Sequence, residues 1–152
     1  MKIDDWGPAT WYLMHTLAEK VKEDEFTKIK NDFIDIILNI CSSLPCPECA
    51  EHARNIMKNL NKNKIVTKEN LKIMLFTFHN NVNKRLRKPL YTNELLDAKY
   101  KSANTQKIVI NFINTWKIPN PNPKLITHNF HKNKTLNKFI EWWRINNTFF
   151  EK

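Results

Sequence analysis

Apolar residues recur every three to four positions through most of this chain, a spacing that predicts amphipathic helices. Pro8 suits the first turn of a helix over residues 9–21. Within it, Trp11, His15 and Ala18 have the spacing that places side chains on one helix face. The beginning of the chain is therefore expected to be helical, with an aromatic ring and an imidazole side by side.

The same spacing predicts further helices over residues 26–42, 47–60 and 68–86. Thr67 and Asn70 are typical of the start of the last of these. The connections between the four helices are short, which favours antiparallel neighbours. We therefore expect an all-α fold whose core is a four-helix bundle.

The second half of the chain is expected to add to this bundle. A fifth helix, an additional short element, is expected over residues 92–116. Pro119, Pro121 and Pro123 then mark a break that no helix crosses. The tail over 135–149 is rich in Phe and Trp and is expected to form a short helix that docks on the bundle or on another subunit.

These patterns divide the chain into a domain over residues 1–116 and a Pro-rich linker with a helical extension over residues 117–152. A length of 152 residues is enough to bury a hydrophobic core. Gly7 is the only glycine, too few for the tight turns of an all-β fold. A P-loop and a dinucleotide-binding Rossmann motif are excluded because each needs several glycines.

The net charge of +10 has several readings. It fits a lysine-rich solvated surface, an anionic cofactor, an acidic partner or nucleic acid. The only dense basic cluster is Lys84, Arg85, Arg87 and Lys88. Charge alone does not choose among these readings.

The residues that begin this sequence contain no apolar segment of the secretory type, and no run of about 18 apolar residues predicts a membrane span. We therefore expect a cytoplasmic protein in a reducing compartment. In such a compartment a Cys-x-x-Cys pair is more often catalytic or metal-binding than structural.

Cys46 and Cys49 form such a pair, with Pro47 and Glu48 between them. The predicted helix starts here, and its unpaired N–H groups and positive end favour a thiolate at Cys46. Cys49, one turn into the helix, is the natural disulfide partner. This arrangement favours redox chemistry, in which the outer sulfur meets incoming thiols.

Zinc binding is the competing interpretation. Cys46, Cys49, His52 and His79 could supply four ligands, as in a zinc-stabilised basic module that binds nucleic acid. Zinc modules usually repeat a second cysteine pair at fixed spacing, and that second pair is missing here. A reductase of the thioredoxin type would need a βαβ pattern, which is not seen.

The helix over residues 68–86 carries a second group of polar side chains. His79, Asn83 and Leu86 share one face by their spacing, and Asn80 lies beside them. Lysines 84 and 88 line a neighbouring edge. Flat rings, amides and lysines suit a ligand with an aromatic plane and phosphates.

Three blocks of the sequence together resemble the Erv/ALR family of FAD-linked sulfhydryl oxidases. The blocks are Trp6-Gly7-Pro8-x-x-Trp11-x-x-x-His15, Pro45-Cys46-Pro47-Glu48-Cys49 and His79-Asn80-x-Val82-Asn83-x-x-Leu86-x-Lys88-Pro89. They cover roughly residues 6 to 100 in family order. The compact form is most similar to the short thiol oxidases of large cytoplasmic DNA viruses, whose location is the host cytoplasm or virus factory.

The resemblance implies a helical bundle that binds FAD and oxidises protein thiols at the expense of oxygen, giving hydrogen peroxide. Cys46 and Cys49 are the implied catalytic residues: Cys46 exchanges with substrate thiols and Cys49 faces the flavin. The implied cofactor-binding residues are Gly7, Trp11, His15, Cys49, His52, His79, Asn80, Val82, Asn83, Lys84, Lys88 and Tyr100. No metal site is expected.

The chain also departs from the family pattern. A second disulfide that many members carry is missing, because its positions correspond to Phe76 and Asn93. No cysteine follows Cys49, so a shuttle pair is absent, and the resemblance implies a separate thioredoxin-like or small dithiol partner. It also implies a homodimer formed through the first two helices. Cys41 is expected to be a buried apolar residue.

Overall fold

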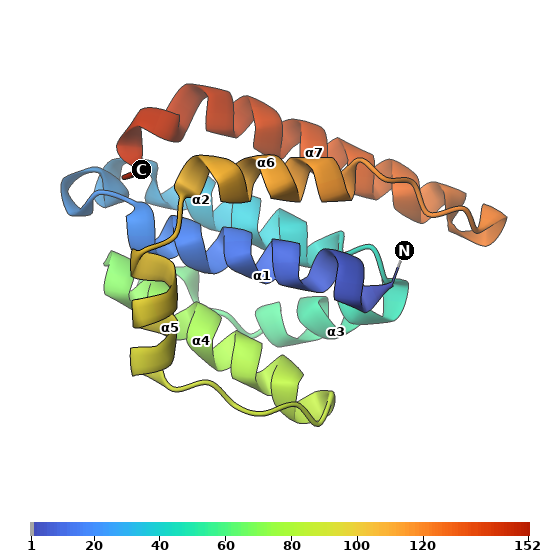
Figure 1. Cartoon of the computed structure of the whole chain (residues 1–152), viewed down its shortest axis with the longest axis horizontal. Helices are drawn as coiled ribbons and strands as arrows, with labels where there is room; N and C mark the ends of the chain where they lie inside the picture. The colour runs from blue at the N-terminus through green and yellow to red at the C-terminus, as the bar shows by residue number, and fades with distance from the viewer. Residues whose placement is uncertain (1) are drawn as a thin grey trace.

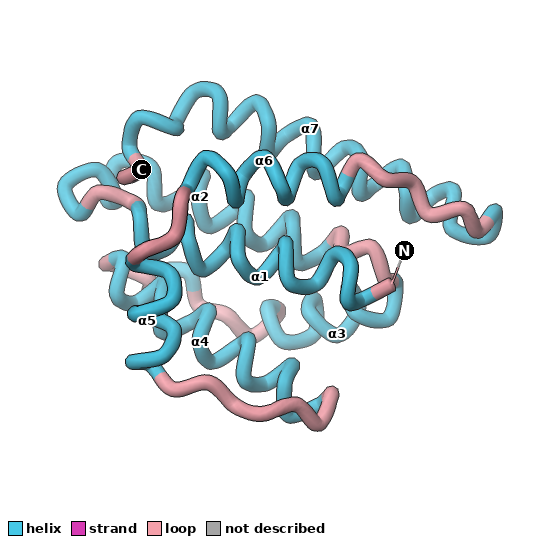
Figure 2. The backbone as a smooth tube through the Cα atoms, in the orientation of Figure 1, coloured by secondary structure: helices cyan, strands magenta, loops and turns pink. Residues whose placement is uncertain are grey.

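The computed structural model describes residues 2–152, and within them regular structure is helical, as predicted (Figures 1 and 2). The α-helices are α1 (Ile3–Lys20), α2 (Glu23–Ser42), α3 (Pro47–Met57), α4 (Lys68–Arg85), α5 (Asn93–Lys101), α6 (Thr105–Trp116) and α7 (Ile126–Asn146). Single 3-10 turns lie at Lys62–Lys64, Pro123–Leu125 and Asn147–Phe149. The all-α fold class is therefore confirmed.

Three of the predicted boundaries are wrong, for local reasons. Helix α1 begins at Ile3, before the predicted residue 9, because the Asp5 side chain caps it by accepting a hydrogen bond from the Lys2 backbone N–H at 3.2 Å, and Pro8 lies inside the helix rather than at its first turn. The single helix expected over 92–116 is two helices, because Asn104 caps α6 by accepting a hydrogen bond from the backbone N–H of Lys107 at 3.0 Å. Asn favours such caps over helix interiors, so the sequence carried this signal. The tail helix α7 begins at Ile126, well before the predicted residue 135, and buries one face along most of its length.

The helices form two groups around α1 (Figure 1). On one side α1 contacts α4 and α5, and on the other it contacts α6 along its length. Helix α2 contacts α3 and α7, and α6 also packs against α7. The central helix α1 is consequently buried almost all round, with Leu13, Met14 and Leu17 inside the core.

The aromatic tail belongs to the same hydrophobic core as the first helices. The buried side chains of α6 and α7 include Phe112, Trp116, Phe139 and Trp142, and the Trp142 ring stacks at 5.4 Å on Phe33 of α2. The predicted docking of the tail on the bundle is thus what the structure has. The division at residue 116 stays a prediction, since the core joins residues on both sides of it.

A charged cluster ties α4 to its neighbours. The Nζ of Lys72 on α4 lies 2.6 Å from a Glu19 carboxylate oxygen on α1 and 3.1 Å from an Asp97 oxygen on α5. Burial by itself lowers the pKa of Lys72, but hydrogen bonds with Glu19 and Asp97 raise it above its usual value. Phe76 and Asn93 line a cavity beside this cluster. Ion pairing therefore links α4 and α5 near Phe76 and Asn93, the two positions at which the sequence predicted that a disulfide is missing.

Across residues 2–152, none of the helices combines the length and the apolar character that a bilayer crossing requires.

Candidate active site

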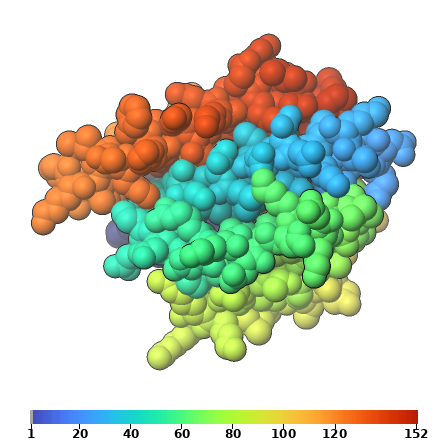
Figure 3. Space-filling model, turned by 180° about the vertical axis from the view of Figure 1, so that it is seen from behind, coloured from blue at the N-terminus to red at the C-terminus, as the bar shows by residue number. Residues whose placement is uncertain are grey.

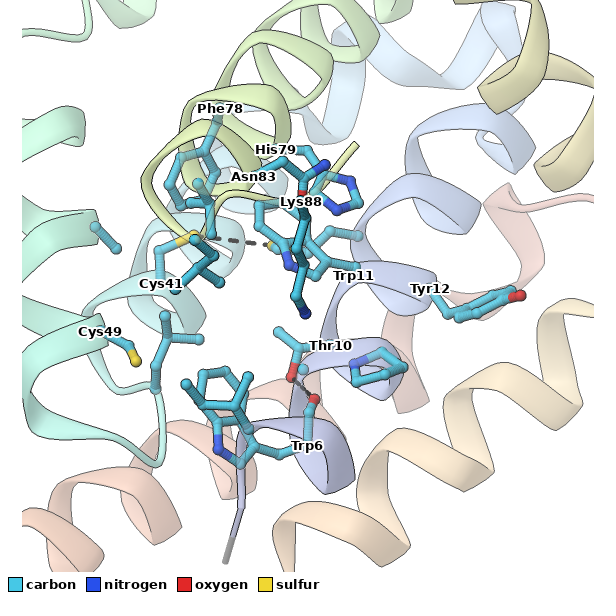
Figure 4. A pocket seen from close by; sticks show the side chains of 18 of the residues that line it. Trp6, Thr10, Trp11, Tyr12, Cys41, Cys49, Phe78, His79, Asn83 and Lys88 are labelled. Atoms are coloured by element: carbon cyan, nitrogen blue, oxygen red, sulfur yellow. Dashed lines mark hydrogen bonds between the residues drawn. The ribbon is translucent and has the colours of Figure 1, made fainter. Parts of the chain in front are cut away.

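A cavity lies at one end of the helical bundle, between α1, α3, α4 and α5 (Figure 4). The volume of the cavity is about 180 Å³. Its walls combine indole, imidazole and phenol rings with a thiol, an amide and cationic side chains: Trp6, Trp11, Tyr12, Cys49, His52, Phe78, His79, Asn83, Arg85, Lys88, Tyr91, Lys99 and Tyr100.

The cysteine pair lies at the start of α3 (Figure 4 labels Cys49). Cys46 is the N-cap residue and Pro47 occupies the first turn, as the sequence predicted. The Cys49 backbone N–H donates a hydrogen bond to the Cys46 sulfur at 3.3 Å, a contact that favours negative charge on that sulfur. Both thiols are free and half-buried, and of the two only Cys49 lines the cavity.

The Cys49 thiol holds its proton more firmly than an ordinary cysteine. Burial, followed by the hydrogen bond and charge interaction with Cys46, raises the pKa of Cys49 to about 12, and the positive charge of Arg85 acts in the opposite direction. Burial and then Arg85 lower the pKa of His52, which lies on the same wall. Arg85 is thus the cation that acts on both groups beside the disulfide position.

A stack of flat rings forms the wall opposite Cys49. The His79 ring lies 3.9 Å from the Trp11 ring, centroid to centroid, at an interplanar angle of 5°. His15 Nε2 and His79 Nδ1 are hydrogen-bonded at 2.8 Å, so one of the two rings donates and the other accepts. Burial lowers the pKa of His15 to about 3 and that of His79 to about 4, with the charge of Lys99 adding to both shifts. Both imidazoles are therefore neutral near pH 7.

Polar groups are available for a ligand between these walls. The Asn83 side chain is buried, and its Nδ2 has no hydrogen-bond partner among residues 2–152. Lys88 extends into the space beside it (Figure 4). The Lys88 backbone N–H bonds the Asn83 carbonyl at 2.8 Å across Arg87, whose positive φ of 57° ends α4. An unsatisfied amide, stacked rings and several cations fit a flat aromatic ligand that carries phosphates.

The predicted site residues fall into two sets. Those that line the cavity are Gly7, Trp11, Cys49, His52, His79, Val82, Asn83, Lys88 and Tyr100. His15 lies behind His79, and Asn80 holds the Tyr91 backbone through hydrogen bonds of 2.9 and 3.0 Å. Lys84 is exposed and is not on the cavity wall.

Sequence reasoning missed several side chains that line the cavity, among them Lys99 on α5. Its Nζ lies 4.5 Å from the centre of the Tyr12 ring and close to the Tyr91 and Tyr100 rings, within the range of cation–π contact. Tyr12, Tyr91 and Arg85 were missed as well. Lys99 directly precedes Tyr100, which was a predicted cofactor-binding residue. The direction of the Lys99 side chain, however, depends on where α5 packs.

The C-terminal helices support two walls of the cavity from behind. Trp116 of α6 donates from Nε1 to Thr10 Oγ1 at 2.9 Å, and Thr10 in turn donates to the Trp6 carbonyl at 2.7 Å. His128 of α7 bonds the carbonyl of Leu44 at 2.5 Å, two residues before Cys46. His128, which lies beyond the predicted domain of residues 1–116, thus bonds the segment that leads into Cys46.

The competing zinc site is not assembled. Among residues 2–152, no three side chains of His, Cys, Asp or Glu lie close enough together to hold a metal ion. Cys46, Cys49, His52 and His79 therefore do not form the ligand set that the zinc interpretation required.

Comparison with known proteins connects this cavity to a family. Residues 8–102 match the Erv1 / Alr family. An FAD-linked sulfhydryl oxidase of African swine fever virus (isolate Tick/Malawi/Lil 20-1/1983) is 34% identical over 120 residues, which cover 73% of this chain and 95% of that protein. FAD-linked sulfhydryl oxidase ERV1 of Arabidopsis thaliana is 32% identical over 97 residues, which cover 64% of this chain and 50% of that protein. No solved structure matches the chain.

Proposed function

The chain belongs to the Erv1/Alr family and is a flavin-linked thiol oxidase, and we propose that the disulfide of Cys46 and Cys49 is its redox centre. In this proposal Cys46 exchanges with protein thiols and Cys49 passes the electrons inward to FAD. The observation that carries it is the position of the pair at the start of α3, where Cys49 but not Cys46 lines the cavity.

The residues of the chain account for the thiol steps. A substrate thiolate attacks the Cys46 sulfur of the oxidised pair, so that a mixed disulfide forms and the Cys49 thiolate leaves. A second substrate thiol attacks the mixed disulfide, which releases the substrate as a disulfide and Cys46 as a thiol. Two substrate thiols are oxidised and the Cys46–Cys49 disulfide is reduced. The Cys49 N–H that bonds the Cys46 sulfur stabilises negative charge there.

The cavity residues fit FAD. The planar stack of Trp11 and His79 suits a flat ring, the unpartnered amide of Asn83 suits a polar edge, and Lys88 with Lys99 supplies charge for phosphates. Held by Trp11, His79, Asn83 and Lys88, FAD would supply a two-electron acceptor for the reduced cysteine pair, and reoxidation by oxygen would give hydrogen peroxide. The neutral imidazole pair of His15 and His79 holds the Trp11 ring in its orientation without adding positive charge.

The substrate is a protein dithiol, and the partner that brings it remains the predicted thioredoxin-like or small dithiol protein. This chain has no cysteine after Cys49 that could serve as an internal shuttle, so thiols must reach Cys46 directly. A reducing compartment such as the cytoplasm is part of the same proposal.

A homodimer stays a prediction, but its geometry needs revision. The resemblance implies contact through the first two helices, yet α6 covers α1 and α7 covers α2 in this chain. Outward positions of α2 such as Asp24, Asn31 and Asp35 are polar. A second copy would have to bind another face, and light scattering of the purified protein measures whether it does.

The decisive experiment replaces one sulfur. Cys49→Ser is expected to abolish thiol oxidation while the purified protein stays yellow, because the cavity is intact but the electron path is broken. Loss of dithiothreitol thiols, followed with a thiol reagent, measures turnover, and the visible spectrum measures bound flavin. Turnover retained in Cys49→Ser would contradict the assignment. A colourless native protein whose spectrum does not respond to dithiol would overturn the function as a whole.

A further inference from the structure

The hairpin formed by α6 and α7 projects beyond the rest of the molecule at the end that carries the cysteine pair. Figure 1 shows its orange tip extending past the other helices, and Figure 3 shows the same overhang from behind. His128 fixes this overhang to the Leu44 carbonyl at 2.5 Å, and Leu44 precedes Cys46 by two residues. Two residues span at most about 7 Å of chain, so the His128 anchor at the base of the overhang lies close to Cys46.

The tip exposes apolar side chains that the fold leaves uncovered. Ile118 is 55% exposed, Ile126 is 69% exposed and Phe130 is 67% exposed. Ile126 and Phe130 are one helical turn apart and share the outward face of α7. A single exposed apolar residue is ordinary, whereas three within a short segment mark a contact surface.

The charge of this region is unusual for the chain. Residues 98–140 contain eight lysines and no Asp or Glu, which makes up +8 of the net charge of +10. At the tip, Lys117 and Lys124 are exposed, and neither forms an ion pair with any of the described residues 2–152. The surface therefore attracts anionic groups and at the same time offers apolar contact.

The tip is also held in one shape. Lys132 is fully buried and donates to the Ile118 carbonyl at 2.7 Å, and Asn129 donates to the Asn120 carbonyl at 2.9 Å. Pro119, Pro121 and Pro123 restrict the backbone between these contacts. A surface ordered before binding loses little conformational entropy when a partner arrives.

We propose that this hairpin tip (Lys117, Ile118, Lys124, Ile126 and Phe130) is the docking surface for the thiol-carrying substrate, an acidic protein with exposed apolar side chains. The proposal rests on the thiol oxidase function above and adds the class of partner. Docking on the tip places the partner's thiols beside Cys46 without a shuttle in this chain.

The occupant follows from charge and cysteine content. A second copy of this chain also carries +10 and offers no cysteine pair other than its own redox centre, so it repels and supplies no substrate thiols. Nucleic acid has no thiols, and the exposed Glu48 and Glu51 of α3 lie in the segment next to the cysteine pair, where a continuous phosphate backbone would meet them. An acidic protein can place its carboxylates against the lysines of the tip and present its dithiol, at another point of its surface, to Cys46.

The test uses three substrates of the full-length enzyme. Two synthetic peptides carry the same Cys-x-x-Cys dithiol and one Leu, flanked either by glutamates or by lysines, and dithiothreitol is the small dithiol. We expect kcat/KM for the acidic peptide to exceed that for the basic peptide by about 10-fold at low salt, and the difference to shrink as salt is added.

Matched charge reversals locate the surface. The double variant Lys117→Glu and Lys124→Glu is expected to lower kcat/KM for the acidic peptide about 10-fold and to leave dithiothreitol turnover unchanged. The control, Lys107→Glu with Lys138→Glu, makes the same charge change on α6 and α7, farther from the tip. It is expected to have a much smaller effect. Equal effects of the two double variants would mean that net charge alone is sensed and would overturn the proposal.

The apolar part of the surface is tested with a double variant at the tip and a single control variant away from it. A fluorescent acidic peptide with both cysteines replaced by serine reports binding without turnover. Ile126→Ser with Phe130→Ser is expected to weaken its binding several-fold, whereas Ile145→Ser at the other end of α7 is not. Ile145 is 60% exposed, so the control removes a side chain of similar exposure.

The outcomes separate the two proposals. No oxidation of dithiothreitol means that the thiol oxidase function fails. Oxidation of dithiothreitol with equal use of both peptides means that only the docking proposal fails. Tighter binding of a fluorescent single-stranded oligonucleotide than of the acidic peptide, with the same loss in Lys117→Glu and Lys124→Glu, would assign the tip to nucleic acid and overturn the proposal.

Discussion

The segment over helices α1–α5 contains the cavity and the cysteines, whereas the hairpin of α6 and α7 contributes packing contacts. Every side chain that lines the cavity lies between Ile3 and Tyr100, and all three cysteines are in that part. The hairpin has no cysteine and lies beyond the family match of residues 8–102. It nevertheless shares the core and bonds the segment that leads into Cys46. Reactive groups and the contacts that position them are thus in different parts of the chain.

Removal of residues 103–152 is expected to have the largest effect. It exposes the faces of α1 and α2 that Phe112, Trp116, Phe139 and Trp142 cover. Truncation of one buried aromatic costs about 3–5 kcal/mol, so losing several exceeds the whole stability of an ordinary domain. Thermal unfolding and flavin content measure the result. A truncated protein that unfolds cooperatively and stays yellow would show that the first five helices are self-sufficient.

Lys72 in the first segment and Lys132 in the hairpin allow the two regions to be compared through the removal of one charge from each. Lys72→Met in the first segment is expected to lower the free energy of unfolding by about 2 kcal/mol, because it removes ion pairs with two carboxylates and leaves that of Glu19 largely buried. Lys132→Met in the hairpin is expected to change it by less than about 1 kcal/mol, since burial of that charge already carries a cost. Urea unfolding at neutral pH measures both, and equal losses would contradict the distinction.

The sign of the pH dependence follows from the two pKa shifts. The pKa of Lys72 is raised in the folded state, so its stabilisation is present below the usual lysine pKa and is lost as the pH rises through the raised value. Burial lowers the pKa of Lys132, so the cost of its charge disappears as the pH rises through the lowered value. The two variants should therefore change the alkaline stability profile in opposite directions.

His128 tests whether the hairpin positions the redox centre. His128→Leu removes the donor to the Leu44 carbonyl and is expected to lower kcat/KM for dithiothreitol by about 10-fold, because the Cys46 segment loses its anchor. His128→Gln keeps an N–H at similar reach and should restore much of the rate. If the role of His128 were purely structural, His128→Leu would lower the thermal stability and leave the alkylation rate of Cys46 unchanged.

The smallest expected effect is an increase in stability, produced by a substitution at Arg87. Arg87 is exposed and has a φ of 57°, a conformation that costs an L-residue about 1 kcal/mol more than glycine. Arg87→Gly should therefore raise the free energy of unfolding by about 1 kcal/mol, provided that Lys88 keeps its bond to Asn83. Lower stability of this variant would mean that the Arg87 side chain makes a contribution larger than its backbone strain.

Much of the first segment could be predicted because its signals are local. Pro47 at the first turn, the Thr67–Asn70 start of α4 and the spacing of His79 and Asn83 each depend on residues close in sequence. The hairpin was predicted less well. The Asn104 cap was overlooked, and the early start of α7 depends on burial of Lys132 and Thr135 against distant helices, which no local pattern shows.

The sequence by itself determined the helical class, the cysteine pair at a helix start and the resemblance to a flavin-linked oxidase, because helix periodicity and motif spacing are properties of short segments. Only the tertiary structure decided which thiol faces the cavity, which cations enter it and that α6 and α7 cover α1 and α2. Those outcomes depend on the packing of side chains far apart in the chain, such as Trp116 with Thr10 and His128 with Leu44. Packing of that kind is fixed by the shape of the whole core, and no short stretch of sequence contains it.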